Sequence, residues 1–321
     1  MTRTRSLASG ILSFSAAAVL ALTTAGGASA APASPSPSDE KALPSIVRLA
    51  VNSAGAADYW TSERMQQALP GDVLAAKAMD RGNNANPASV ERGKNAKVKA
   101  SKGKDTSTTS VAHIGKVFFS MGGANYVCSG NAVTSENKST VSTAGHCVIG
   151  GPGQEATNFT FVPAYDNGKA PYGKWTAREL FTTDEWSSSG NIAYDTAFAV
   201  MDPLNDALLT DVVGGSGVAF NQERGLSYTS YGYPADKPFT GLTLKSCTGT
   251  ASPDTINKDF GTQGIPCDMT SGSSGGPWFI GSGPGGMQNS INSYGYSGSK
   301  VMYGPYWGKV IENVYNDASE S

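Results

Sequence analysis

Ser274 stands in a run of small residues, since positions 272–277 read Gly-Ser-Ser-Gly-Gly-Pro. A serine that attacks a carbonyl carbon needs a tight, sterically bare turn whose backbone N–H groups face the oxygen that becomes negatively charged. Gly272 and Ser274 would supply two such N–H groups. The run therefore indicates an acyl-transfer nucleophile, although a glycine- and serine-rich segment by itself is more often an ordinary loop.

A nucleophilic serine needs a base within reach, and the chain has two histidines. His146 follows a β-prone run of small residues at 141–145 and precedes Cys147. His113 precedes a strand-like run at 114–119, and we interpret it as a surface histidine at the start of a strand. His146 is therefore the candidate base.

The third residue of such a site is a carboxylate that orients the imidazole and stabilises the imidazolium. Asp195 interrupts an apolar, strand-like run at 191–200. A carboxylate at such a place is costly unless something hydrogen-bonds to it. Alone, Asp195 would be interpreted as a turn aspartate capping a strand, but beside the other two residues it is the candidate partner of His146.

These motifs, in this order, resemble those of the trypsin-like serine proteases of the chymotrypsin fold, within the secreted bacterial branch that includes the glutamyl endopeptidases. The motifs are Thr-Ala-Gly-His-Cys at 143–147, Tyr-Asp-Thr-Ala at 194–197 and the run at 272–277. The resemblance covers about residues 111–321. It implies an all-β fold of two six-stranded antiparallel barrels with a C-terminal helix.

The resemblance also implies a serine endopeptidase that hydrolyses protein or peptide substrates through an acyl-enzyme. Ser274 would be the nucleophile, His146 the base, Asp195 its orienting partner, and the N–H groups of Gly272 and Ser274 the oxyanion hole. Such a site needs no metal and no organic cofactor, and we expect a monomer.

Other hydrolases fit the sequence less well. Positions 272–276 also satisfy the G-x-S-x-G pattern of lipases and esterases, but that fold needs a histidine after the serine, and none follows Ser274. The subtilisin order would leave the motif around Asp195 unexplained. Two isolated histidines cannot form a helical H-E-x-x-H zinc site. A catalytically inactive relative that acts as an extracellular binding module is the remaining alternative, and the intact set of three residues argues against it.

Substrate specificity is where the sequence is ambiguous. By the family spacing, Asp268 lies at the base of the pocket for the residue before the scissile bond (P1), where a carboxylate would select Arg or Lys. The alternative is that Asp268, directly after Cys267, hydrogen-bonds a loop. Ser293, Tyr294 and Gly295 resemble the strand that lines this pocket and binds the substrate backbone. Glutamyl endopeptidases place a histidine near this strand, and positions 291–294 contain none. A basic P1 residue is therefore favoured over glutamate or an apolar residue.

Activation should differ from that of the vertebrate enzymes. In those enzymes an aspartate before the nucleophile pairs with a new N-terminus, and here that position is Ser273. Activation should therefore depend on removal of a leader rather than on that salt bridge.

The four cysteines allow three pairings. The resemblance implies a disulfide between Cys128 and Cys147, beside the candidate base, and Cys247 then pairs with Cys267. Zinc ligation is the rival interpretation, but no C-x-x-C spacing exists.

The chain divides into three parts. Residues 1–30 have the basic start, short apolar core and small-residue cleavage site of a secretory signal peptide, so we expect a secreted, extracellular product without a membrane anchor. Residues 31–110 are expected to be a propeptide that ends in a polar, lysine-rich linker at 81–110, although a solvated spacer is the alternative. Residues 111–321 form the expected protease domain. Two short helices are expected in the propeptide, one capped by Thr61 and one at 73–79.

Charge follows the same division. Residues 1–110 carry 13 Lys+Arg and 8 Asp+Glu, and residues 111–321 carry 11 and 18. The negative protease domain argues against nucleic acid or an anionic membrane as a partner, and the propeptide itself is the expected intramolecular partner.

The elements that must position the site are short strands separated by turns rich in Gly, Asn, Asp and Ser, which indicates an all-β sandwich or barrel. A helix is expected at the end of the chain, at 308–316. The expected strands are 116–121, 126–133, 158–163, 196–201, 227–232, 242–248, 277–281 and 301–306.

Overall fold

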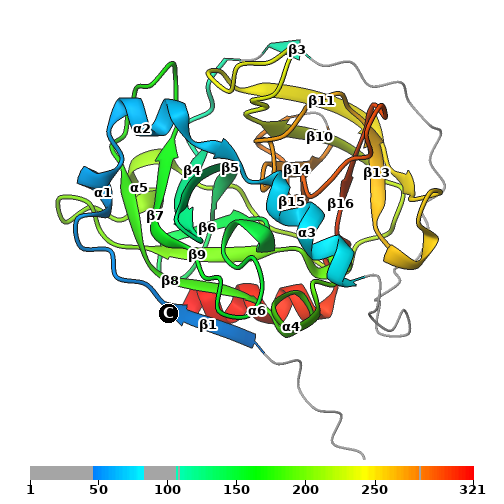
Figure 1. Ribbon diagram of the computed structural model, residues 1–321, viewed down its shortest axis with the longest axis horizontal. Helices are drawn as coiled ribbons and strands as arrows, with labels where there is room; N and C mark the ends of the chain where they lie inside the picture. Colours follow the sequence, from blue (N-terminus) through cyan, green and yellow to red (C-terminus); the bar gives the residue numbers. More distant parts are fainter. Residues whose placement is uncertain (1–45, 83–105, 108, 282) are drawn as a thin grey trace, which may run out of the picture. The chain divides into compact units, whose positions relative to one another are not determined.

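The computed structural model describes residues 46–82, 106–107, 109–281 and 283–321 (Figure 1). The expected signal peptide and most of the expected linker lie outside these residues. Among the helices that are described, none has the length and apolar character needed to cross a membrane.

The first half of residues 111–321 forms a closed antiparallel barrel of six strands. Strand β8 pairs with both β7 and β9, which closes the order β7-β4-β5-β6-β9-β8. Alternate apolar side chains such as Val117, Phe161 and Phe198 fill its interior. The strands are β4 (Ile114–Met121), β5 (Ala124–Val133), β6 (Thr140–Thr143), β7 (Thr157–Pro163), β8 (Trp175–Thr183) and β9 (Ala197–Met201).

The described strands of the second half divide between two antiparallel sheets. The five-stranded sheet has the order β15-β14-β10-β11-β3, and the three-stranded sheet has the order β12-β13-β16. The predicted all-β class is thus confirmed. These strands are β3 (Thr106–Ser107), β10 (Ser227–Gly232), β11 (Lys245–Thr250), β12 (Ser252–Pro253), β13 (Gln263–Pro266), β14 (Pro277–Ile280), β15 (Gln288–Ile291) and β16 (Val301–Gly304).

The described helices are short except for α3 and α6. The expected C-terminal helix is present as α6, whose apolar face packs on β8 and β9. The expected cap at Thr61 is also confirmed, because its Oγ1 accepts a hydrogen bond from Arg64 N at 3.3 Å. The helices are α1 (Ala56–Tyr59), α2 (Ser62–Gln67), α3 (Asp72–Gly82), α4 (Asp184–Ser189), α5 (Leu209–Val213) and α6 (Lys309–Glu320), and the 3₁₀ turns are η2 (Gly145–Cys147), η3 (Ile192–Tyr194) and η4 (Lys258–Phe260).

Residues 46–82, which we call the leader segment, pack against residues 111–321 within one compact unit. Strand β1 (Ile46–Ala50) extends the first barrel by pairing antiparallel with β8, and β2 (Leu69–Pro70) pairs parallel with β5. Trp60 is fully buried and donates from Nε1 to the carbonyl of Asn158 at 2.7 Å. Helix α3 then packs on η2, η3 and α4, between the two halves of the protease domain (Figure 1).

Candidate active site

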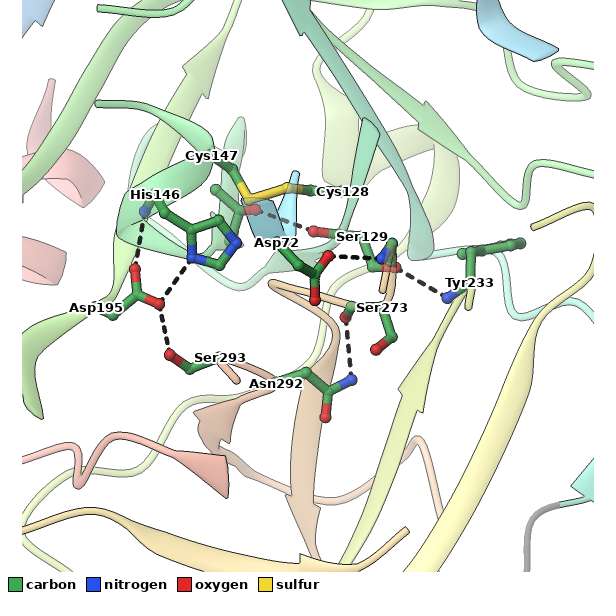
Figure 2. Close-up of a disulfide and its surroundings, with 12 residues drawn as sticks. Asp72, Cys128, Ser129, His146, Cys147, Asp195, Tyr233, Ser273, Asn292 and Ser293 are labelled. Atoms are coloured by element: carbon green, nitrogen blue, oxygen red, sulfur yellow. Dashed lines mark hydrogen bonds and ion pairs between the residues drawn. A yellow bond between two sulfur atoms is a disulfide. The ribbon is translucent and has the colours of Figure 1, made fainter. Parts of the chain in front are cut away.

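His146 and Asp195 are joined at the edge of the first barrel. His146 lies in η2 just after β6, and Asp195 caps η3 just before β9. Asp195 Oδ1 accepts from His146 N and Oδ2 from His146 Nδ1, both at 2.8 Å (Figure 2). Ser293 Oγ donates a further bond to Oδ2 at 2.5 Å. The buried carboxylate thus holds the ring in one orientation with Nε2 free.

The turn that carries Ser274 packs against the segment that carries His146. Gly275 has a φ of +81°, and a Cβ there would meet Thr143 Oγ1 at 2.3 Å and Ala144 N at 2.9 Å. Only glycine therefore allows this approach. Ser274 O also accepts from Ser129 N at 2.7 Å, which fixes the turn on β5.

Ser274 Oγ and His146 Nε2 are the candidate nucleophile and base atoms of this site. Both are buried, and in the described part of the chain neither has a hydrogen-bond partner. Burial lowers the pKa of His146, but the charges of Asp195 and Asp72 and the hydrogen bond with Asp195 together raise it above its ordinary value. The two carboxylates thus outweigh burial in the direction of this shift.

Hydrogen bonds fix the backbone of Gly272. Gly272 has a φ of +94°, and its carbonyl accepts from Ser129 Oγ at 3.0 Å, while Ser129 Oγ accepts from Tyr233 N at 2.9 Å. These bonds fix the carbonyl of Gly272 on Ser129. The N–H of Gly272 is the expected oxyanion donor.

The neutral side chain of Ser273 makes a local hydrogen bond. Its Oγ donates to Thr270 O at 2.8 Å, and its carbonyl accepts from Asn292 Nδ2 at 3.1 Å. Asn292 Nδ2 also donates to Tyr231 O, and its Oδ1 accepts from Ser230 Oγ and Trp278 Nε1. The amide of Asn292 is thus committed to the buried structure and is not available to a substrate side chain.

A cavity of about 550 Å³ is lined by residues 267–271, which precede the turn that carries Ser274, and by the residues expected to bind substrate. Asp268, Ser293, Tyr294 and Gly295 line it together. Asp268 Oδ1 is buried without a hydrogen-bond partner in the described structure, and Oδ2 lies 3.8 Å from the exposed Lys300 Nζ. Ser293 also has the contact with Asp195, a role that the strand resemblance did not predict.

Asp254 was not predicted to belong to the site. Its buried Oδ2 accepts from Tyr294 Oη at 2.8 Å and from Tyr296 Oη at 2.6 Å. Both tyrosines line the cavity on either side of Gly295. Asp254 thereby fixes one wall of the cavity from behind.

Asp72 is the second residue that the sequence did not point to. It is the first residue of α3, and its Oδ2 accepts from Gly272 N at 2.7 Å (Figure 2). Burial raises the pKa of this carboxyl, although the charge of His146 and the bond from Gly272 oppose the shift. Ser274 Oγ is close enough to lower the pKa of Asp72 as well, but without a hydrogen bond of normal geometry.

Two disulfides support the site from outside. Cys128 is bonded to Cys147, next to His146, and Cys247 is bonded to Cys267, next to Asp268. This is the pairing that the resemblance implies.

No family model matches the chain. The chain is similar to the protease Anisep from Arthrobacter nicotinovorans, with 65% identity and a TM-score of 0.67 over 68% of this chain and 100% of that one. It is also similar to the thermostable serine protease AL20 from an extremophilic microorganism, with 52% identity and a TM-score of 0.63 over 65% and 98% of the two chains. A Glu endopeptidase, at 19% identity and a TM-score of 0.54 over 68% and 97%, shares the fold.

One relative is named as a metalloprotease rather than a serine protease. An extracellular metalloprotease of Bacillus subtilis (strain 168) is 28% identical over 153 residues, and the chain spans about half of its length, 46%. Among the described residues, the one group of three potential metal donors within reach of one another is Cys128, His146 and Cys147. Both of these sulfurs are in a disulfide. This donor set does not fit a metal ion.

Proposed function

Because this chain belongs to the serine proteases of the chymotrypsin fold, we propose that Ser274, His146 and Asp195 form the catalytic triad of its peptide-bond hydrolysis. Ser274 Oγ attacks the scissile carbonyl carbon while His146 Nε2 removes its proton. The carbonyl oxygen becomes an anion that accepts hydrogen bonds from the N–H groups of Gly272 and Ser274. Collapse of this intermediate breaks the C–N bond, and His146 returns the proton to the leaving amine.

The acyl-enzyme is then hydrolysed by the same groups. Water adds to the ester carbon as His146 takes its proton, and Ser274 leaves as the alcohol with that proton restored. Asp195 remains a carboxylate throughout and stabilises the imidazolium.

The observation that carries this proposal is the double hydrogen bond between Asp195 and His146, with Ser293 as the third donor. This arrangement holds the tautomer with Nδ1–H, so that Nε2 is left as the acceptor. No other described histidine has such a partner, because His113 Nδ1 contacts the amide oxygen of Asn131.

The test is the variant Ser274→Ala, measured after the leader has been removed. We expect kcat/KM for peptides to fall by about 10³-fold or more, because the nucleophile is lost while the binding groups remain. A fluorophosphonate should label the processed wild type at Ser274 and leave the variant unlabelled. Retained hydrolysis by the pure variant would contradict the assignment, and a processed wild type that is neither labelled nor active would favour a binding module.

We propose that the cavity lined by Asp268, Ser293 and Tyr294 binds a basic P1 residue, with Asp268 as its counter-charge. A carboxylate oxygen that is buried without a partner is costly, and a guanidinium or ammonium would supply the missing hydrogen bonds. The committed amide of Asn292 removes the support for glutamate. A panel of peptides that differ only at P1 tests this, and cleavage after Glu as fast as after Arg would contradict it.

The enzyme is proposed to act outside the cell, after export and removal of residues 1–110. The support comes from the signal-like residues 1–30 and from two disulfides, which persist in oxidising compartments. N-terminal sequencing of the secreted protein would identify both cleavage sites.

A further inference from the structure

The leader segment covers the proposed catalytic residues. With this segment in place His146 is 0% and Ser274 is 1% exposed. Asp72, Val73, Ala75 and Ala76, all of α3, form part of the wall of the substrate cavity. A substrate cannot approach Ser274 while α3 occupies this position.

One group of the leader segment enters the reaction space itself. Asp72 Oδ2 lies 2.7 Å from Gly272 N, the donor that would stabilise the substrate oxyanion. The charge of the same carboxylate also acts on His146. A carboxylate has the negative charge and the oxygen acceptor that a tetrahedral intermediate presents at this position.

The backbone around Asp72 differs from that of a substrate. Asp72 begins a helix of 11 residues, so its main-chain carbonyl accepts within or beside that helix rather than lying extended across Ser274. The group offered to the oxyanion donor is a side chain that has no scissile bond. The enzyme can therefore hold this segment without cutting it there.

We infer that the leader segment is a built-in inhibitor, in which the carboxylate of Asp72 occupies the oxyanion hole of the uncut chain. The inference rests on the proposed function. Cutting the linker does not by itself remove this inhibitor, because β1, β2 and the buried Trp60 hold it independently of the linker. Activity begins when α3 leaves.

The test uses the full chain with its linker uncut, verified by intact mass, and follows the rate at which a fluorophosphonate labels Ser274. Asp72→Ala removes the carboxylate. Asp80→Asn is the matched control, because it removes one negative charge from an exposed position of the same helix. We expect the uncut wild type and Asp80→Asn to react roughly 100-fold more slowly than the processed enzyme. Asp72→Ala should react about tenfold faster than the uncut wild type, as loss of a charge-assisted hydrogen bond implies.

Hydrogen exchange of the β1 amides reports whether the leader segment remains docked. If the β1 amides of Asp72→Ala lose their protection, the leader segment has undocked, and the labelling test is repeated with Asp72→Asn. This variant keeps the size of the side chain and an acceptor for Gly272 N. That variant should react roughly threefold faster than wild type with β1 protected. Equal rates for the wild type and both Asp72 variants would overturn the inference, as would an uncut wild type as reactive as processed enzyme. Failure of the processed enzyme to react would instead overturn the proposed function, and the inference with it.

Discussion

Two carboxylates act on His146, and they come from different parts of the chain. Asp195 belongs to the protease domain and makes two hydrogen bonds to this residue. Asp72 belongs to α3. Its charge raises the pKa of His146, whereas burial lowers it. An imidazolium cannot take a proton from Ser274. The leader segment therefore disfavours the reactive protonation state in addition to filling the site.

Replacement of Asp72 by Asn in the uncut chain should lower the pKa of His146, because one of the negative charges that raise it is removed while the shape is kept. The imidazolium would then lose its proton at a lower pH than in the wild type. NMR titration can follow this directly, since the chain has only two histidines. His113, which faces Asn131 and whose pKa is lowered by burial, is the internal control and should not move. An unchanged His146 titration would show that the charge of Asp72 does not reach the ring.

The residues of the proposed site that belong to local motifs could be identified from the sequence, and those that the tertiary fold brings to it could not. His146, Asp195 and Ser274 each stand in a short recognisable pattern. Asp72 reads in the sequence as an ordinary acidic residue in the first turn of a helix, and nothing local indicates that Gly272 will be its partner. Asp254 meets Tyr294 and Tyr296 only because two separate segments of the second half are brought together.

Just before α3, the backbone at Gly71 lies very close to the disulfide of Cys128. A Cβ at this position would lie 2.6 Å from Cys128 Sγ, in the disulfide beside His146. Gly71 N also donates to Val127 O at 2.9 Å, directly before Asp72. The placement of Asp72 thus depends on a residue without a side chain.

Gly71→Ala should loosen α3 without any effect on the processed enzyme, which by the proposal no longer contains residue 71. In the uncut chain we expect fluorophosphonate labelling to be several-fold faster than in the wild type, because a contact of 2.6 Å forces the segment to shift. Gly55→Ala is the control for an alanine in the leader segment, although its φ of +75° adds local strain far from the site. Labelling at the wild-type rate would mean that α3 tolerates the shift.

Several strands were predicted from the sequence, but the polar, buried strand β15 was not. The expected strands at 126–133 and 227–232 correspond to β5 and β10. Strand β15 was missed because it reads Gln-Asn-Ser-Ile. Its Gln288 Oε1 accepts from Asn131 Nδ2 at 2.7 Å and from Ser142 Oγ at 2.9 Å, so a polar network replaces apolar packing there.

The leader segment carries no net charge. Residues 46–82 carry four basic and four acidic residues, while residues 83–110 carry six basic and two acidic ones. The contrast between a positive leader and a negative protease domain, clear in the sequence, is thus not what holds the leader segment in place. Strand pairing and buried apolar side chains such as Leu74 and Ala78 do so.

A buried lysine makes the stability of the whole fold depend on pH. Lys116 donates from Nζ to Gly241 O at 3.0 Å beside the ring of Tyr165, and burial lowers its pKa to about 7. Between about pH 7 and 10 the folded state holds Lys116 neutral while the unfolded state holds it charged. The free energy of unfolding should therefore rise with pH by about 1.4 kcal/mol per unit from this residue.

Lys116→Met should remove this contribution. Denaturant unfolding at several pH values, on the Ser274→Ala background to prevent self-digestion, would compare the two proteins. The difference in stability between wild type and Lys116→Met should shift in favour of the wild type as the pH rises above about 7. A difference that is constant from pH 6 to 10 would mean that Lys116 stays charged in the folded protein.

The pairing of β1 with β8 has a consequence for when the enzyme becomes active after it is cut. While the chain is continuous, the leader segment meets its site at the high effective concentration of a tethered group, of millimolar order. Once the linker is severed, only the bulk concentration of protein remains, and the β1–β8 ladder delays separation without preventing it. Inhibition would then persist in a concentrated secretion and fade as the protein spreads into a larger volume, so that dilution rather than cleavage sets the moment of release.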